Sequence, residues 1–327
     1  MSIELPLASG TWDPATYARE YVDLRAWLDG EISDPQLCAV IAAHCPGLQP
    51  QRVRALVVGD NHRFAVRGED VRWALPELER GQILGAFFLG VDGDDALVAV
   101  HFLSQCEEEW NDLRRQGQAL SATDRQLLAV GAGLVSWHAR SGFCARCGGS
   151  TAIRFAGWQR QCERCQNVEY PRIDPSVIVA IFDAEQRLLL AHNTMWRPGY
   201  ASLVAGFMEI GESPEQAVVR ETFEEVGLRI DRVRYVASQP WPFPRSLMLG
   251  FAAQLAAGAS PRPRVDGVEI DWARFYSRSE YRAAVEAGEV EMPNPISIAR
   301  VMIESWLAGS DLHEDGAVPP SVYARGQ

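Results

Sequence analysis

The sequence predicts two mixed α/β domains with a small cysteine-bearing module between them. Its 327 residues accommodate two or three domains of ordinary size. Two Cys-x2-Cys pairs lie between residues 144 and 165, and a new α/β pattern follows the prolines of Tyr170-Pro-Arg-Ile-Asp-Pro175. Because two prolines in five residues interrupt regular structure, we place a boundary there. The predicted segments are an N-terminal mixed α/β domain, the module, the second α/β domain and a loosely held tail, over 1–139, 140–172, 173–312 and 313–327.

The composition excludes several classes of chemistry. All 31 basic residues are arginine, since the sequence contains no lysine. This rules out a P-loop lysine, a protein-kinase ATP lysine, a pyridoxal Schiff base and any lysine nucleophile. The formal net charge of −12 leaves no broad basic surface for a phosphate backbone. A nucleic-acid substrate would therefore have to be bound through a local patch.

No membrane or export address is evident in the sequence. No stretch approaches roughly 18 consecutive apolar residues, and the first ten residues lack the basic start and apolar core of a secretion signal. We therefore expect a cytoplasmic protein with no membrane partner, whose seven cysteines do not form a disulfide framework. Three of them, Cys38, Cys45 and Cys106, are expected to be buried apolar thiols.

Short β-rich runs dominate the N-terminal segment, as at 54–58 and 82–89. Val91-Asp-Gly-Asp-Asp95 lies between two apolar runs and predicts a hairpin turn. From Ser121 the pattern becomes that of a helix, which starts at Ser121-Ala-Thr-Asp124 and has apolar positions at Leu127, Leu128, Leu134, Val135 and Trp137. We find no catalytic pattern in this segment.

Four cysteines form the strongest motif for a metal. Cys144-x2-Cys147 and Cys162-x2-Cys165 are separated by fourteen residues, the pattern of a two-knuckle site with four thiolates around one Zn²⁺. Four sulfur ligands leave no open position for water, so this zinc, one per chain, is expected to be structural. The alternative is four unligated buried thiols. Such a module can also bind nucleic acid, although solvated surface side chains are the simpler interpretation of Arg146, Arg160 and Arg164.

A helix rich in glutamate is the most informative segment. Ser213-Pro214-Glu215-Gln216 predicts its start, with a serine N-cap, proline at the first helical position and glutamine for a capping box. Gly227 is placed to end it. At about 100° per residue, one face is predicted to pack and the opposite face to concentrate negative charge. The apolar face comprises Val219, Thr222, Phe223 and Val226, and the acidic face comprises Glu221, Glu224 and Glu225.

The three glutamates repel one another at i, i+3 and i+4, at a cost of roughly a few tenths of a kcal/mol per pair on a bare helix. A hard cation such as Mg²⁺ or Mn²⁺ would reverse that cost, because it binds carboxylate oxygens and is completed by water and substrate phosphates. The alternative is a solvated acidic face. It accounts for the glutamates alone, but not for the glycine, glutamate and arginine held at fixed distances around them.

The pattern extends to both sides of the helix. It reads Gly206-Phe-Met-Glu-Ile-Gly-Glu212, seven residues, then Arg220-Glu-Thr-Phe-Glu-Glu-Val-Gly-Leu228. This resembles the Nudix box, Gly-x5-Glu-x7-Arg-Glu-U-x-Glu-Glu-x-Gly-U with U aliphatic. Thr222 is the one departure, and its valine-like shape implies a small packing cost. The resemblance implies an α/β/α sandwich hydrolase that cleaves a nucleoside diphosphate linked to another group, with metals bound by this loop-helix-loop.

A proline-rich string, Ser238-Gln-Pro-Trp-Pro-Phe-Pro-Arg-Ser246, follows the box. Alone it predicts a stiff, extended segment that forms a rigid loop or a pocket wall. The string resembles the signature of NADH pyrophosphatases among Nudix enzymes, and the upstream zinc ribbon belongs to the same family. This resemblance covers roughly residues 110–305, so the N-terminal region adds little to it. Gly157 stands where some relatives carry an acidic substrate contact.

The resemblance implies a set of site residues. It implies that the four cysteines bind zinc, and that two or three Mg²⁺ or Mn²⁺ ions are bound by Glu221, Glu225, Glu269 and the main-chain carbonyl of Ala205. Asp271 is the alternative to Glu269 as the metal ligand from this later segment. Tyr170 and Phe207 are implied to stack on the rings of a dinucleotide, against an alternative of ordinary packing. The remaining pocket residues are Gln239, Pro240, Trp241, Pro242, Phe243, Pro244, Arg245, Ser246 and, through its backbone, Ala299.

The implied reaction is hydrolysis of the pyrophosphate bond of NADH, and of NAD⁺, to AMP and nicotinamide mononucleotide. Glu224 or Glu225 would orient or deprotonate the attacking water, while Arg220 positions the carboxylates of the box, Glu212 among them. Removal of an NAD cap from the 5′ end of RNA by the same site is the first alternative. A non-hydrolysing nucleotide sensor is the second, which the intact glutamate set disfavours. The family also implies a homodimer.

Overall fold

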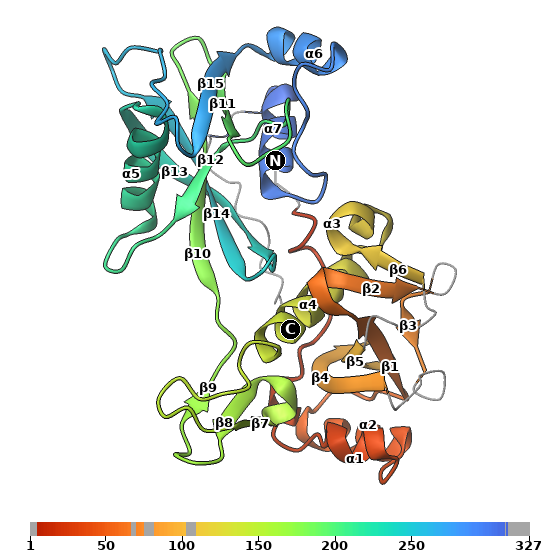
Figure 1. Ribbon diagram of the computed structural model, residues 1–327. Helices are drawn as coiled ribbons and strands as arrows, with labels where there is room; N and C mark the ends of the chain where they lie inside the picture. The colour runs from red at the N-terminus through yellow and green to blue at the C-terminus, as the bar shows by residue number, and fades with distance from the viewer. Residues whose placement is uncertain (1–4, 67–69, 75–81, 103–108, 311, 313–327) are drawn as a thin grey trace. The chain divides into compact units, whose positions relative to one another are not determined.

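The computed structural model describes residues 5–66, 70–74, 82–102, 109–310 and 312, which divide into two compact units (Figure 1). Unit 1 contains residues 5–8, Ile173–Trp241, 246–310 and 312, and unit 2 contains Ser9–Arg172 and Pro242–Arg245. Cys106 and the predicted tail 313–327 lie outside the described residues. None of the helices in these ranges is both long and apolar enough to span a membrane.

A six-stranded sheet forms the N-terminal part of unit 2. Its strands follow the order β4-β5-β1-β2-β6 with β3 paired to β1; β1 and β5 run parallel and the other pairs antiparallel. The strands are β1 Arg52–Val58, β2 Arg63–Val66, β3 Arg72–Trp73, β4 Ile83–Asp92, β5 Asp95–Phe102 and β6 Glu109–Asp112. The helices are α1 Leu24–Asp29, α2 Asp34–His44, α3 Leu113–Gln116 and α4 Ala122–His138, with 3-10 turns at Thr16–Ala18, Asp60–His62 and Gly117–Ala119.

The hairpin and the helix predicted for this part are confirmed. Strands β4 and β5 pair as far as Asp92 and Asp95, which leaves a two-residue turn containing Gly93 at a φ of 57°. Ser121 caps α4 by accepting a hydrogen bond from the N–H of Asp124 at 3.1 Å. The apolar positions Leu127, Leu128, Leu134 and Val135 are buried, whereas Trp137 is only half-buried.

A small antiparallel sheet after α4 completes unit 2, with β7 Thr151–Arg154, β8 Gln159–Cys162 and β9 Val168–Glu169, and a 3-10 turn at Phe155–Gly157. His138 of α4 joins this sheet to the N-terminal part. Its ring stacks on Phe87 with 4.4 Å between centroids. A guanidinium only donates, so Nδ1 accepts from Arg160 at 2.9 Å and Nε2 donates to the Gly157 carbonyl at 2.9 Å. Burial lowers the pKa of His138 to about 4, which keeps the imidazole neutral as these bonds require.

Gly157 is required at this junction. Its φ is 98°, and a Cβ atom there would lie 2.6 Å from the ring of Phe87. A side chain at this position would displace the ring that stacks on His138. The absence of an acidic residue at position 157 therefore has a local packing cause.

The sheet of unit 1 lies between two helical layers, which confirms the α/β/α sandwich (Figure 1). Its strand order is β13-β14-β10-β11-β15 with β12 paired to β10, and β10 and β14 run parallel. The strands are β10 Asp174–Phe182, β11 Leu188–Asn193, β12 Val204–Phe207, β13 Ile230–Trp241, β14 Ser246–Leu255 and β15 Ile270–Tyr276. The helices are α5 Pro214–Val226, α6 Arg278–Glu286 and α7 Ile298–Leu307.

Alternate side chains of β10 point to opposite faces of the sheet and so join the two hydrophobic cores of unit 1. Val177, Val179 and Ile181 join the core under α5, and Ile178, Ala180 and Phe182 join the core under α6 and α7. A strand that is apolar on both sides is what a sandwich of this kind needs at its centre.

The N-terminal end departs from the predicted domain order. Leu5 is 2% exposed and belongs to the core under α7, and Ala8 packs against the same core. Residues 5–8 are therefore part of unit 1, although the sequence placed them in the N-terminal domain. Such a long-range contact leaves no local pattern to predict it from.

Candidate functional site

Helix α5 begins and ends as predicted, but it turns a different face to the sheet. The Ser213 N–H donates to Gln216 at 2.8 Å in a capping box, and Gly227 ends the helix at a φ of 64°. Val219 and Phe223, predicted to pack, are 44% and 49% exposed. The predicted faces were therefore wrong in part, because the helix is rotated toward its acidic side. Its buried residues are Ala217, Val218, Thr222, Glu225 and Val226.

Glu225 is a buried carboxyl group with an unused oxygen. Its side chain is buried, and Oε2 has no hydrogen-bond partner among the described residues. Burial, followed by the charges of Glu221 and Glu269, raises the pKa of Glu225 to about 8. The Thr222 hydroxyl is also buried, again with no partner in the part of the chain that the structure describes. A carboxyl group in such surroundings retains a proton or takes up a cation.

Glu221 lies over strand β12, where Gly206 makes room for it. A Cβ atom at Gly206 would be 2.0 Å from the carboxyl carbon of Glu221. Burial raises the pKa of Glu221 above its ordinary value. Ala205, whose carbonyl is implied by the family resemblance to bind a metal, precedes Gly206 on the same strand and pairs with Ile178 of β10.

Arg220 ties the acidic groups of the helix to the preceding loop. It donates to both carboxyl oxygens of Glu212 at 2.8 and 2.9 Å, to Glu221 at 2.8 Å and to Glu224 at 3.0 Å. It also donates to the main-chain carbonyl of Phe207 at 2.9 Å. These bonds lower the pKa of Glu212 and raise that of the guanidinium. Arg220 therefore compensates part of the repulsion within the cluster.

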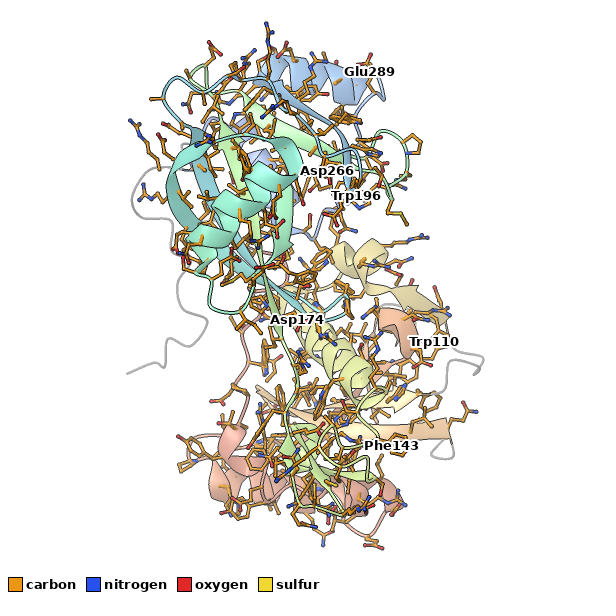
Figure 2. All side chains as sticks on the ribbon, turned by 60° about the vertical axis from the view of Figure 1, so that its left-hand side comes forward. Trp110, Phe143, Asp174, Trp196, Asp266 and Glu289 are labelled. Atoms are coloured by element: carbon orange, nitrogen blue, oxygen red, sulfur yellow. The ribbon has the colours of Figure 1, made fainter. Side chains whose placement is uncertain are left out.

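Asp266 organises the loop before β15. Its carboxylate accepts hydrogen bonds from the N–H groups of Val268, Glu269 and Ile270 at 3.3, 3.1 and 2.9 Å, and these donors lower its pKa. Glu269 is exposed, and its charge is among those that raise the pKa of both Glu221 and Glu225. The structure thus brings the loop before β15 within electrostatic reach of α5. Asp266 is labelled in Figure 2.

The acidic cluster of Glu221, Glu225 and Glu269 fits a hard divalent cation. It offers carboxylate oxygens, one of which is buried and has no hydrogen-bond partner among the described residues, and Arg220 bonds to Glu221 within it. Among the described residues, the four cysteines are the group whose ligand atoms are gathered closely enough to hold an ion. The glutamate carboxylates are not gathered in this way, and Glu221 accepts a hydrogen bond from Arg220.

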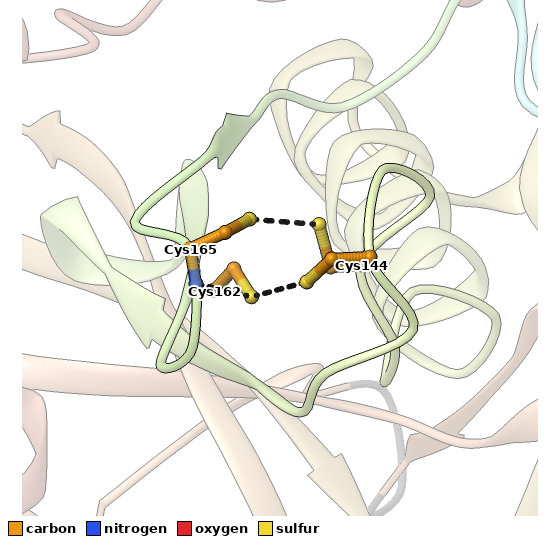
Figure 3. Close-up of side chains that lie close together, drawn as sticks. Cys144, Cys162 and Cys165 are labelled. Atoms are coloured by element: carbon orange, nitrogen blue, oxygen red, sulfur yellow. Dashed lines mark hydrogen bonds between the residues drawn. The ribbon is translucent and has the colours of Figure 1, made fainter.

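The four cysteine sulfurs gather at one end of the small sheet, all within 4.8 Å of one another. Sγ of Cys144 lies 3.7 Å from that of Cys165, and Sγ of Cys147 lies 3.5 Å from that of Cys162 (Figure 3). Backbone N–H donors, that of Cys165 first, lower the pKa of the Cys162 thiol to about 6. Four gathered sulfurs with N–H donors suit a tetrahedral Zn²⁺. Cys38 and Cys45 are free and buried, as predicted.

The comparison with protein families decides the identity of both parts. A model of the NUDIX domain matches residues 172–294, and a model of the NADH pyrophosphatase zinc ribbon domain matches residues 139–170. The chain contains a Nudix domain preceded by an NADH pyrophosphatase zinc ribbon domain. The Nudix match covers α5, β12 and the loop of Asp266, and the ribbon match covers all four cysteines.

Several curated proteins are similar to this chain. The NAD-capped RNA hydrolase NudC of Mycobacterium bovis is 44% identical over 205 residues, which cover 60% of this chain and 65% of that protein. The human NAD-capped RNA hydrolase NUDT12 is 31% identical over 274 residues, 79% of this chain and 58% of that protein. Each match thus spans less than two thirds of the relative's length. Among solved structures, a Nudix hydrolase from Nitrosomonas europaea has a TM-score of 0.40 at 23% identity, over 51% of this chain and 93% of that chain.

The Nudix domain holds some of the predicted pocket residues in structural roles. Gln239 is completely buried, where it donates to the Ile296 carbonyl at 3.0 Å and accepts from the Ile298 N–H at 2.6 Å. Both ends of its amide are thereby used to fix the start of α7. Ala299 is the second residue of that helix and its side chain is buried, so only its backbone is available. Phe207, by contrast, is 59% exposed on β12.

The proline-rich string is a hairpin and not one extended segment. Pro240 and Trp241 end β13, Ser246 begins β14, and Trp241 pairs with Ser246. The turn, Pro242–Arg245, belongs to unit 2, where Pro242 is buried. The ring of Phe243 meets His62 edge-on, with 4.9 Å between centroids.

The zinc ribbon and the hairpin turn line a cavity of about 660 Å³ within unit 2. Tyr170, predicted to stack on substrate, lies in its wall with 61% of its surface exposed, and Pro244 and Arg245 lie there as well. Two contributions to the sites were not predicted from the sequence. Asp266 was identifiable only as one more acidic residue near Glu269. The lining residues Trp137, Arg140 and Phe143 belong to a helix end and a knuckle that showed no catalytic pattern.

Proposed function

We propose that this protein hydrolyses the pyrophosphate bond of NADH and NAD⁺ to nicotinamide mononucleotide and AMP, with a divalent metal held by the Nudix domain. One observation carries the proposal. Glu225 presents a buried oxygen that has no hydrogen-bond partner among the described residues, within an acidic cluster that also contains Glu221 and Glu269. A chain has little reason to bury a carboxyl group among like charges unless a cation neutralises them. The family of the zinc ribbon and the names of the relatives point to the NAD substrate.

Glu221, Glu225, Glu269 and the Ala205 carbonyl would hold two or three Mg²⁺ or Mn²⁺ ions. Bound there, the metal supplies an activated water and neutralises charge on the phosphoryl oxygens. Arg220 keeps Glu212, Glu221 and Glu224 in place before the metal arrives. We assign Glu224 the task of orienting the attacking water, because it is the exposed member of the set, with 59% of its side chain accessible. The four cysteines would hold one structural zinc.

The remaining pocket residues are assigned by the same reasoning. Phe207 and Tyr170 are the exposed rings suited to stacking on the bases or the nicotinamide. Gln239 and Ala299 contribute to the substrate pocket through the start of α7. The Gln239 amide fixes the position of this helix start. We further propose that the protein is cytoplasmic and forms a homodimer. Sedimentation of the purified protein would test the dimer directly.

The test is AMP release from NADH, NAD⁺ and ADP-ribose, and release of nicotinamide mononucleotide from NAD-capped RNA, each with Mg²⁺ or Mn²⁺. We expect turnover of NADH, and a fall in kcat of at least about a hundredfold in Glu225→Gln, with the fold retained. Near-normal turnover by this variant would overturn the assignment of Glu225. Binding of NADH without any AMP would instead identify a nucleotide sensor.

Removal of an NAD cap from RNA is the second candidate function. Both relatives named above are NAD-capped RNA hydrolases, and the bond to be cleaved is the same. The ratio of kcat/KM for NAD-capped RNA to that for NADH, measured at one salt concentration, decides between the two substrates.

A further inference from the structure

The segment that carries Glu269 is attached to the end of helix α5. The last carbonyl groups of a helix have no partner within the helix itself. At the end of α5, the Arg264 N–H donates to the Val226 carbonyl at 2.8 Å. The Asp266 N–H donates to the Glu225 carbonyl at 3.2 Å. Asp266 is thus bonded through its backbone to the residue whose carboxyl group is buried in the acidic cluster.

The Asp266 side chain (labelled in Figure 2) uses its two oxygens for different donors. Oδ1 accepts from the N–H groups of Val268 and Ile270, at 3.3 and 2.9 Å. Oδ2 accepts from the Glu269 N–H at 3.1 Å. Gly267, at a φ of 72°, forms the turn that brings these N–H groups back toward the carboxylate. One carboxylate oxygen is therefore used to hold the backbone of Glu269.

Thr194, directly after β11, holds the other side of Glu269. Its N–H donates to the Glu269 carbonyl at 2.8 Å, and its hydroxyl donates to the Val268 carbonyl at 2.9 Å. The N–H and the carbonyl of Glu269 are thereby both bonded, to Asp266 and Thr194 respectively. The backbone of Glu269 is fixed on two sides, while its side chain is exposed and can meet a cation.

We propose that Asp266 is a positioning residue for the metal, which holds Glu269 at the distance from Glu225 at which both carboxylates can bind the same divalent cation. The inference rests on the proposed function, since it takes these two glutamates as metal ligands. Asp266 joins them directly, with its N–H on the carbonyl of Glu225 and its carboxylate on the N–H of Glu269. Without a cation the two ligands repel one another, and this pair of bonds opposes their separation.

Asp266 has little capacity left to bind the metal itself. A carboxylate has about four lone-pair sites, and three N–H groups already use those of Asp266. Its negative charge could still attract a cation without any positioning role. The test must therefore separate three effects, namely direct ligation, charge and the placement of Glu269.

The first variant is Asp266→Asn, which is close to a single-bond deletion. The amide keeps one oxygen for Val268 and Ile270, and it presents to the Glu269 N–H an amino group that cannot accept. We expect the dissociation constant for Mn²⁺, measured by electron paramagnetic resonance of the full chain without substrate, to rise about tenfold. Asp231→Asn is the matched control, because it removes the same charge from an exposed position on β13.

A double-mutant cycle with Glu269→Gln decides how Asp266 acts. If it acts through Glu269, adding Asp266→Asn to Glu269→Gln should change the Mn²⁺ dissociation constant by less than about twofold. Additive losses would overturn the proposal, since Asp266 would then act as a ligand or through its charge. Unchanged Mn²⁺ affinity with a lower Tm in Asp266→Asn would also overturn it and leave a purely structural turn.

Metal binding keeps this inference separate from the proposed function. Mn²⁺ binding that follows the cycle above, without AMP from NADH, would refute the proposed hydrolysis and still support the role of Asp266. Where NADH is hydrolysed, a higher Mn²⁺ concentration should restore the activity of Asp266→Asn, because the ligand Glu269 is still present. Absence of Mn²⁺ binding by the unaltered protein would overturn the inference.

Discussion

Glu225 is protonated, and therefore uncharged, in the metal-free protein at neutral pH. Its carboxyl group is buried among like charges, and its pKa of about 8 means that the metal-free domain retains a proton there at neutral pH. Arg220 relieves the neighbouring glutamates, since among the described residues it bonds to Glu212, Glu221 and Glu224 but not to Glu225. A cation would substitute for that proton.

The first prediction follows from this pKa. The folded protein binds a proton at Glu225 that the unfolded chain has released above its ordinary pKa of 4.5. Without divalent metal, stability should therefore fall as pH rises from about 4.5 to about 8, at up to about 1.4 kcal/mol per pH unit from this group. Glu225→Gln should remove that slope. Urea unfolding of both proteins across this range measures it, and parallel pH profiles would contradict the prediction.

Gly206 supplies the second prediction. In Gly206→Ala the new Cβ would displace the Glu221 carboxyl group, 2.0 Å away, which is the movable end of a side chain. We expect kcat to fall about tenfold or more while the free energy of unfolding changes by about 1 kcal/mol or less. Gly142→Ala is the control, because nothing lies within 4 Å of a Cβ atom at that position. Full activity of Gly206→Ala would show that Glu221 can bind from another position.

At the scale of elements, helix α5 shows what periodicity can and cannot predict. Its caps were predicted correctly because they are local: the Ser213 and Gln216 side chains bond to each other's backbone N–H, and Gly227 takes up the positive φ that ends the helix. The buried face was predicted wrongly in part, since Glu225 is buried where Phe223 was expected. Periodicity assumes that apolar groups face inward, and a site that binds a cation inverts this rule locally. The motif spacing carried the information that periodicity lacked.

The cap of α5 supports the third prediction. Ser213→Ala removes the acceptor of the Gln216 N–H and should cost about 1 kcal/mol. The loss should appear in thermal unfolding of the Nudix domain, with KM little affected because α5 is also held by its buried face. An unchanged Tm would mean that water replaces the serine hydroxyl without a loss of stability.

At the scale of the whole molecule, local patterns predicted both metal motifs and the sandwich. They did not predict that Leu5 packs under α7, or that the turn Pro242–Arg245 belongs with the ribbon's unit. Both facts depend on contacts between residues far apart in sequence. The cavity of unit 2 was not predicted for the same reason, since its lining comes from α4, two knuckles and that turn.

Zinc removal gives the fourth prediction. The ribbon is bound to the N-terminal part through His138, which bonds to both Gly157 and Arg160. Loss of zinc should therefore lower the unfolding temperature of unit 2 as a whole and not merely loosen the cysteine knuckles. Cys147→Ser is expected to carry less than one zinc per chain and to unfold several degrees earlier. Equal Tm values with and without zinc would exclude a structural role for the ion.

The hairpin turn has a consequence for how this protein can be divided. A fragment cut at Arg172 would retain the ribbon and the N-terminal sheet but lose Pro242, which is buried in that unit. The complementary fragment would retain the proline without its surroundings. Neither unit can therefore be transferred to another protein as one continuous segment of sequence. Residues 5–8 belong to unit 1, and Pro242–Arg245 belong to unit 2.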